Sequence, residues 1–161
     1  MEVSFPSLRH DHHACVDDAL AAAERYCREH GLRLTDTRRR VLELIWGDHK
    51  PVGAYALMAQ LDPGGRKAAP PTVYRALDFL MEHGLIHRVA SRNAYIGCAR
   101  PGQSHDPQLF ICKRCDHAAE LDDPQVRAAI ARDARRLGFS ISDETIEIGG
   151  VCAACQVELA S

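Results

Sequence analysis

The sequence has few aromatic residues and no long apolar run. Aromatic side chains make up 6% of its 161 residues. No stretch approaches the roughly 18 consecutive apolar residues of a membrane span. The segment from Met1 to Asp18 is too polar for a secretory signal, since it contains Arg9, Asp11 and Asp17. These absences exclude a membrane protein and favour a cytoplasmic one.

The motifs of zinc hydrolases and deaminases are also missing. A catalytic zinc needs an open coordination position and a nearby acid or base. The sequence contains neither a His-Glu-x-x-His pattern nor a His-x-Glu pattern combined with Pro-Cys-x-x-Cys. We therefore expect a protein that is not an enzyme and has no small organic substrate.

Net charge is low but unevenly distributed. The formal charge is -2, which by itself does not favour a nucleic-acid partner. Residues 33–92, however, carry ten Lys and Arg against six Asp and Glu, whereas residues 93–161 carry seven against ten. Contacts with phosphates need local rather than global positive charge, so this distribution is compatible with DNA binding by the first half of the chain.

Cysteine, by contrast, is abundant, with seven residues. In a reducing compartment this number indicates metal binding or thiol chemistry rather than a disulfide framework. Two close pairs, Cys112 with Cys115 and Cys152 with Cys155, supply four thiolates, which suit a tetrahedral zinc with no open position. We predict a structural zinc at these four residues. The alternative is a thiol–disulfide redox switch, because Cys-x-x-Cys pairs oxidise reversibly.

Apolar periodicity predicts a helical first half that ends in a hairpin. The expected helices span 16–30, 35–47, 54–61 and 70–84, with Thr35 as an N-cap and Pro70 in a first turn. Residues 85–90 and 95–98 look like two strands around a turn, and residues 1–15 like a disordered leader. Helices followed by a hairpin predict a winged helix-turn-helix, whose recognition helix enters the major groove of DNA.

A linker and a second small domain follow. Residues 97–107 contain Gly97, Pro101, Gly102 and Pro107 and form the expected linker. Strands are expected at 109–112, 118–121 and 145–148, and a helix at 124–137. The predicted fold is thus α+β, with a winged-helix DNA-binding domain over 1–96 and a small α/β domain with the structural zinc over 108–161.

A second set of potential metal ligands is spread over both domains. His87 and Cys98 lie on the two hairpin strands, His105 lies in the linker, and Glu120 follows the first cysteine pair. One ion bound by all four would bridge the domains. Taken singly, each residue has an ordinary structural interpretation, such as a hydrogen-bonded strand histidine, a buried thiol, a loop histidine or a surface glutamate.

Candidate DNA contacts lie on the predicted helices of the first domain. Thr72, Tyr74 and Arg75 lie away from the apolar stripe of helix 70–84, and Tyr55 lies at the start of helix 54–61. Arginine can contact guanine through two hydrogen bonds, and tyrosine can bond to phosphate. An exposed arginine on a helix is more often only solvated.

Histidines also gather near the N-terminus. His10, His12 and His13, together with Cys15, offer metal-binding groups. Nothing in the sequence around them fixes a coordination geometry, so we expect a solvated segment rather than an accessory metal site.

Four separated motifs resemble the ferric uptake regulator family. They are Gly31–Thr35 followed by Arg38, the stretch Pro70–Leu80, and the two Cys-x-x-Cys pairs, and the resemblance covers residues 16–156. It implies an N-terminal winged-helix DNA-binding domain and a C-terminal dimerisation domain over 108–161. It also implies homodimers that bind AT-rich inverted repeats.

Within this family the sequence resembles the zinc uptake regulators. Their regulatory His, Cys, His and Glu fall on His87, Cys98, His105 and Glu120. The extra histidines of iron and peroxide sensors are missing from the matching segments 104–107 and 50–53, and a thiolate ligand favours zinc. The resemblance implies a zinc-responsive repressor of zinc uptake genes with about two zinc ions per subunit. The alternatives are an iron- or peroxide-sensing member of the family and the redox switch.

Overall fold

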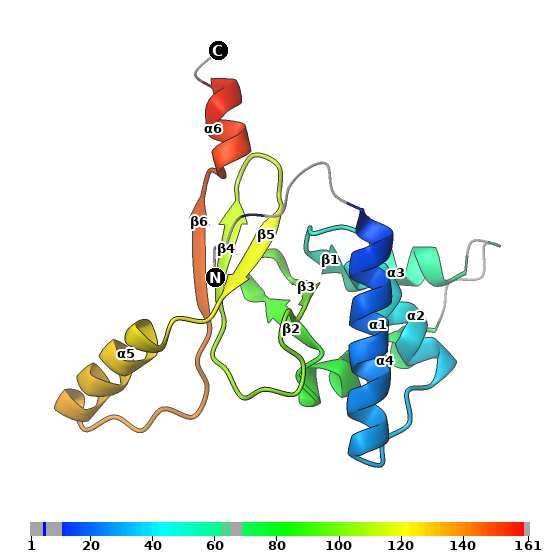
Figure 1. Ribbon diagram of the computed structural model, residues 1–161, viewed down its shortest axis with the longest axis horizontal. Coiled ribbons are helices and arrows are strands. Elements are labelled where there is room, and N and C mark those ends of the chain that lie inside the picture. Colours follow the sequence, from blue (N-terminus) through cyan, green and yellow to red (C-terminus); the bar gives the residue numbers. More distant parts are fainter. Residues whose placement is uncertain (1–4, 6–10, 63, 65–68, 160–161) are drawn as a thin grey trace.

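The computed structural model describes residues 5, 11–62, 64 and 69–159. Helices gather at one end of the molecule, and a small sheet with two projecting helices forms the other end (Figure 1). Among the described residues no helix is both long enough and apolar enough to span a bilayer.

The helical end contains α1 (His12–Glu29), α2 (Asp36–Trp46), α3 (Ala54–Leu61) and α4 (Pro70–Glu82). Helix α1 begins earlier than predicted, because the Asp11 side chain accepts a hydrogen bond from the His13 amide at 2.9 Å and caps the helix. The expectation of a disordered leader is therefore wrong for residues 12–15. Residues 1–4 and 6–10 lie outside the described part of the chain.

Local sequence signals place the other helices as expected. The Thr35 hydroxyl accepts from the Arg38 amide and caps α2, and Pro70 occupies the first position of α4. The apolar stripes of these helices then face one another. Their side chains form a buried core that includes Leu42, Leu57 and Leu77.

A three-stranded antiparallel sheet forms the wing. Strand β3 (Ala94–Gly97) pairs with β2 (Ile86–Val89) on one side and with the short β1 (Val52–Gly53) on the other. The sequence did not predict β1, because two residues carry no periodicity. A 3-10 turn, η1 (Ala90–Arg92), joins β2 to β3. Since β3 extends through Gly97, the connecting segment begins at residue 98 rather than at 97.

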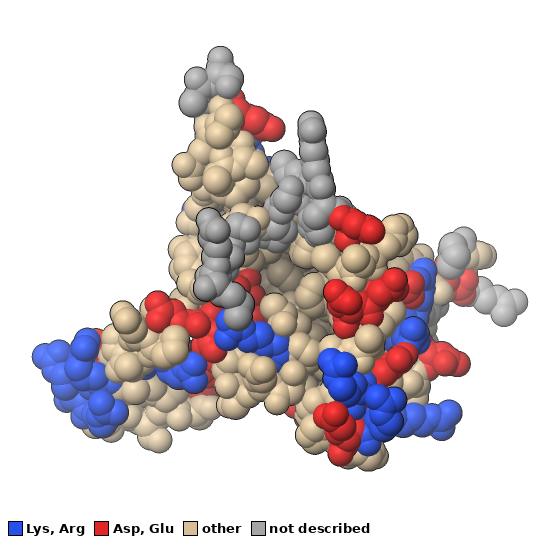
Figure 2. All heavy atoms as spheres, viewed as in Figure 1, with Lys and Arg blue, Asp and Glu red and all other residues tan. Residues whose placement is uncertain are grey.

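The second sheet is mixed. Its central strand β4 (Gln108–Cys112) pairs antiparallel with β5 (Ala118–Leu121) and parallel with β6 (Ile146–Gly150). Helix α5 (Pro124–Leu137) connects β5 to β6, and a helix that was not predicted, α6 (Ala153–Leu159), ends the described chain. Both helices project away from the sheet (Figure 1). Lys and Arg side chains gather over the far end of α5, whose last turn contains Arg135 and Arg136 (Figure 2).

The two sheets pack face to face. One face of the wing carries Ile86 and Tyr95 into the helical core, and the opposite face carries Val89 and Ile96 toward the second sheet. There they form a buried cluster with residues of β4 and β5, including Leu109. This interface places wing residues beside β5, where the second set of potential metal ligands comes together.

Candidate metal centres

Four cysteines converge at one end of the second sheet. Cys112 is the last residue of β4, and Cys115 lies in the following turn. Asp116 has a left-handed φ of 61°, and its amide donates to the Cys112 carbonyl at 3.0 Å, which closes the turn. Cys152 precedes α6 by one residue and Cys155 lies in its first turn, so the two side chains share a face.

The spacing of these sulfur atoms suits tetrahedral zinc. The four Sγ atoms lie within 4.8 Å of one another, and those of Cys115 and Cys152 are 3.8 Å apart. Thiolates around zinc at about 2.3 Å have neighbouring sulfurs about 3.8 Å apart. None of the seven cysteines forms a disulfide. The donor set and its geometry therefore fit a closed four-thiolate centre.

Hydrogen bonds favour ionisation of one of these thiols. Burial acts to raise the pKa of Cys112, but backbone hydrogen bonds from Cys115, Cys152 and Arg114 outweigh it and lower this pKa to about 6. Burial and the neighbouring thiols raise the pKa of Cys155 to about 12. One thiolate forms readily, whereas a full set of thiolates needs a bound cation.

The second centre joins the wing, the connecting segment and the second sheet. His87 lies in β2, and Cys98 follows β3, where its amide extends the ladder to the Leu85 carbonyl at 3.0 Å. His87 is paired with Ile96, two residues before Cys98, so His87 and Cys98 both lie on the side that meets the second sheet. His105 comes from the connecting segment and Glu120 from β5.

The ligand atoms of these four residues also lie within 4.8 Å of one another. Nε2 of His105 is 2.6 Å from Oε1 of Glu120 and 3.4 Å from Sγ of Cys98. Nε2 of His87 is buried, lies 3.4 Å from Oε2 of Glu120 and has no hydrogen-bond partner among the described residues. A bound cation would satisfy this nitrogen, so the four residues fit one metal ion.

The ring of His105 is oriented for metal binding. Its Nδ1 lies 2.7 Å from the carbonyl oxygen of Gln103. A carbonyl only accepts, so Nδ1 carries a proton, and in the neutral ring Nε2 directs its lone pair into the centre. Metal-binding histidines are commonly held in this way. Sequence patterns could not indicate this role of Gln103, because a backbone carbonyl has no side-chain signature.

Charge is distributed unequally over this centre. Burial, followed by the nearby Glu120 carboxylate, raises the pKa of the Cys98 thiol to about 12. Burial would also raise the pKa of Glu120, but contacts with His87, the Ala99 amide and His105 outweigh it and lower this pKa. Without metal the carboxylate is therefore charged and the thiol is protonated, so a divalent cation must displace the thiol proton.

An ionic network holds the connecting segment around this centre. Nη1 of Arg100 lies 3.5 Å from Asp122, and Nη2 of Arg127 in α5 lies 2.7 Å from the same carboxylate. Nε of Arg127 is 3.6 Å from Asp106. Asp106 follows His105 directly, and Asp122 lies two residues beyond Glu120. Arg127 therefore connects two of the segments that carry potential ligands.

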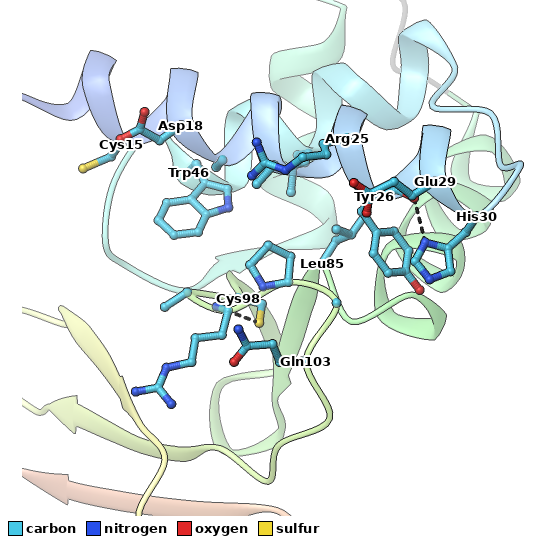
Figure 3. A pocket seen from close by; sticks show the side chains of 17 residues that line it. Cys15, Asp18, Arg25, Tyr26, Glu29, His30, Trp46, Leu85, Cys98 and Gln103 are labelled. Carbon is cyan, nitrogen blue, oxygen red and sulfur yellow. Dashed lines mark hydrogen bonds between the residues drawn. The ribbon is translucent and has the colours of Figure 1, made fainter.

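A cavity of about 600 Å³ borders the centre on the helical side. It lies between α1 and residues 98–103, with Asp18 and Arg25 on one wall and Cys98 and Gln103 on the other (Figure 3). Among the described residues no second cluster of metal-ligating groups lines it. Cys98 is thus the residue shared by the cavity and the metal centre.

The candidate DNA contacts are exposed on two helices that pack against each other. Tyr55 in the first turn of α3 is 80% exposed, and Tyr74 on α4 is 43% exposed. Thr72 and Arg75 are exposed on α4 as well, whereas Val73 of this helix is fully buried. Arg75 has no ion pair within the described part of the chain. Its guanidinium is available to an external partner.

The two described histidines at the N-terminal end, His12 and His13, take part in different contacts. His10 lies outside the described residues. The rings of His12 and His49 pack with their centroids 5.2 Å apart, and the His13 amide takes part in the cap of α1. Among the described residues, no cluster of three or more metal-ligating groups includes His12, His13 or Cys15.

Known proteins resemble most of the chain in sequence. The model of the ferric uptake regulator family matches residues 29–149. The zinc uptake regulation protein of Escherichia coli strain K12 is 40% identical over 141 residues, which cover 87% of this chain and 82% of the relative.

Solved structures resemble it in fold. A zinc uptake regulator complexed with zinc and DNA aligns with a TM-score of 0.85 at 38% identity, over 91% of this chain and 98% of the other. Holo XcZur aligns with a TM-score of 0.79 at 43% identity, over 88% of this chain and 99% of the other. Apo XcZur aligns with a TM-score of only 0.53 at 42% identity, over 89% of this chain and 99% of the other. Because the identities are nearly equal, the scores reflect the arrangement of the chain, which is more similar to that of holo XcZur than to that of apo XcZur.

Proposed function

The chain belongs to the ferric uptake regulator family, and on that premise we propose that it is a zinc-responsive transcriptional repressor that binds operator DNA as a homodimer and controls zinc uptake genes. Members of this family regulate transcription, and the proposed role requires no catalytic step. The two clusters of potential ligands correspond to two zinc ions per subunit.

The observation that carries the proposal is the composition of the second centre. His87, Cys98, His105 and Glu120 come from the wing, the connecting segment and the second sheet, and their ligand atoms lie within 4.8 Å of one another. Nitrogen, sulfur and oxygen donors in a four-residue set suit zinc, and a thiolate disfavours metals that prefer only oxygen ligands. We assign this centre as the regulatory site.

The cysteine centre has a different role in the proposal. Cys112, Cys115, Cys152 and Cys155 all belong to the second half of the chain, so a zinc held by them stabilises that half without linking it to the wing. This structural zinc provides much of the folding free energy of a domain whose own core is small. It stays bound while the regulatory site fills and empties.

Regulation follows from the position of the second centre. A zinc ion there links three segments and favours the arrangement in which the two sheets face each other. Glu120 keeps its charge, His105 is already oriented by Gln103, and Cys98 releases its proton. The coupling equals the differential affinity of zinc for the two arrangements, typically about 1–3 kcal/mol.

Residues 108–161 are proposed as the dimerisation domain. Several large apolar side chains of this half are exposed, including Phe139 at 66% and Leu137 at 82%. The outer face of the second sheet adds Ile148, which is paired with Phe110 in the register of β4 and β6. A second copy of the chain would cover this surface. The dimer then presents two copies of α4 to an AT-rich inverted repeat.

Four exposed residues are proposed to contact that operator. Arg75 and Tyr74 of α4 face outward, with Arg75 reading a base edge and Tyr74 bonding to the backbone. Tyr55 and Thr72 flank them on the adjoining helix starts.

A zinc-titrated binding assay with labelled operator DNA tests the function. Operator binding that rises with zinc at an occupancy of two ions per subunit supports it. Operator binding that is independent of zinc would remove the regulatory assignment. An iron- or peroxide-sensing role is disfavoured because the centre contains Cys98, and the redox switch because both cysteine pairs belong to one cluster.

A further inference from the structure

Glu147 attaches the second sheet to the tip of the wing. Its Oε1 accepts a hydrogen bond from the Ala90 amide at 2.6 Å, and its Oε2 accepts one from the Ser91 amide at 3.1 Å. These residues begin η1, and the first amides of a helical turn have no partner within the turn. A carboxylate more than 50 residues away in the sequence therefore caps this turn.

Glu147 and the metal ligand Glu120 occupy one row of the second sheet. Both are paired with Leu109 of the central strand, one from β5 and the other from β6. Paired residues project to the same face, so all three side chains are directed at the wing. Neighbouring strands lie about 4.8 Å apart, so the two carboxylates stand on the order of 10 Å from each other.

The same row lies along one wing strand and the turn that follows it. Glu120 contacts His87 at the start of β2, and Glu147 contacts the turn that follows Val89 at its end. Between them Leu109, which is 1% exposed, packs against Val89. The metal centre and the Glu147 contact are therefore the two ends of one interface, with an apolar middle.

Glu147 is one of two polar attachments at this end. Burial acts to raise its pKa, but hydrogen bonds from Ser91 and Ala90 outweigh it and lower this pKa, so the carboxylate is charged at neutral pH. The nearby pair Arg92–Asp116 is 2.9 Å long, but its side chains are 40% and 56% exposed. Solvent screening leaves such exposed pairs with little net effect.

We propose that Glu147 is a positioning residue that holds the wing against the second sheet and thereby sets the zinc concentration at which the protein binds its operator. This inference rests on the proposed function. Glu147 makes its contacts only when the two sheets face each other, which is also the arrangement in which the four ligands of the second centre meet. By linkage, a contact that favours this arrangement raises zinc affinity although it touches no zinc ligand.

The test compares Glu147→Gln with the wild-type chain and with Asp143→Asn. A glutamine side chain has nearly the same size as glutamate but only one acceptor oxygen and no charge, so one wing amide loses its partner. Asp143 also lies near β6, and its contact is with Ser142 at 2.8 Å, so Asp143→Asn removes a charge without touching the wing. The measurements are zinc affinity at the second centre, operator affinity against zinc concentration, and hydrogen exchange of the Ala90 and Ser91 amides.

We expect Glu147→Gln to keep both zinc ions and the dimer, to weaken zinc binding at the second centre about tenfold, and to speed exchange of the two amides. Asp143→Asn should match the wild type. Faster exchange with unchanged zinc affinity would overturn the inference, because it would give Glu147 a purely local role. Wild-type binding that ignores zinc would instead overturn the proposed function.

A second variant keeps the test decisive if Glu147→Gln does not fold. Glu147→Asp retains the charge but is one methylene shorter, so it does not reach both amides. A partial loss of zinc affinity in Glu147→Asp supports the inference. Misfolding of both variants would contradict it, because a positioning residue between the two halves is not needed for either half to fold.

Discussion

Nε2 of His105 and Oε1 of Glu120 lie 2.6 Å apart, although the two residues are 15 positions apart in the sequence. His105 lies in the connecting segment, whereas Glu120 lies in β5. The Gln103 carbonyl fixes a proton on Nδ1 of His105, so in the neutral ring Nε2 and Oε1 are both acceptors. Two acceptors at this distance need a proton or a metal ion between them. This relationship is the physical basis for assigning the second centre as the site that senses zinc.

Replacement of Cys98 tests that assignment. Cys98→Ser removes the soft ligand that closes the second centre, so we expect one zinc ion per subunit in place of the two that the clusters allow, with the dimer intact. Zinc should then no longer increase operator affinity. Metal analysis and DNA binding by fluorescence anisotropy measure the two effects. Cys15→Ser is the matched control, because Cys15 is a partly buried cysteine of α1 outside both clusters. A normal zinc response of Cys98→Ser would refute the assignment.

Replacement of Cys112 should have a different outcome. Cys112→Ser breaks the four-thiolate centre, and the second half then loses the metal that stabilises it. We expect loss of the dimer and a lower melting temperature, measured by analytical ultracentrifugation and circular dichroism, even at zinc concentrations that saturate the wild type. Cys98→Ser serves as the comparison in both assays. A stable Cys112→Ser dimer would show that the cysteine centre is not structural.

Arg75 should determine operator preference. Arg75→Ala removes a guanidinium that has no ionic partner within the described chain, so folding should be unaffected. We expect a loss of about 1–3 kcal/mol in operator binding and a smaller ratio of operator to random-DNA affinity. Arg28→Ala, at an exposed arginine in the last turn of α1, is the control. Unchanged discrimination in Arg75→Ala would exclude Arg75 from base recognition.

Zinc binding at the second centre should depend on pH. The pKa of Cys98, raised to about 12 by burial and by Glu120, means that its thiol is protonated at neutral pH, so zinc binding releases this proton. Affinity should therefore rise with pH between 7 and 8, by about tenfold for one released proton. Isothermal titration calorimetry in buffers of different ionisation enthalpy counts the protons. If zinc binding at this centre released no proton, the result would contradict a thiolate ligand.

Arg127 should support the second centre from outside. Arg127→Met keeps the length of the side chain but removes its contacts with Asp106 and Asp122, which flank two ligands. Loss of a ligand's own hydrogen-bond partner typically weakens metal binding by about 10–100-fold, and because Arg127 touches no ligand directly we expect a smaller loss. Competition with a chelator measures this affinity. Arg132→Met on the same helix is the control, since its contact is with the adjacent Asp133. Equal zinc affinities of the two variants would exclude the supporting role.

Much of the fold could be predicted from local sequence. Thr35 and Pro70 mark helix starts through capping and fixed φ, and the apolar stripes place the helices. The cysteine pairs stood out because a two-residue gap lets both sulfurs of a pair reach one ion. The regulatory set needed the family resemblance, since its four members lie on four segments and only the facing of the two sheets brings them together.

Other features depend on contacts that sequence patterns do not record. Gly97 was predicted to begin the linker, but it lies in β3. A Cβ atom at this position would clash with the Trp46 ring. Glu147 lies in the strand expected at 145–148, and nothing in the local sequence marks it as a contact residue. Its role depends on the register that places it beside Leu109. The short elements β1 and α6 have too few residues to show a period.

The most direct test of the account is a titration of operator binding with zinc, iron(II) and manganese(II), performed on the wild-type chain and on His105→Ala. The account predicts that zinc switches the wild type to tight, operator-specific binding at a lower free concentration than either other metal. It also predicts that His105→Ala retains the cysteine-bound zinc but loses the switch. Equal responses to iron or manganese, or a zinc response that survives in His105→Ala, would contradict the claim that His87, Cys98, His105 and Glu120 sense zinc.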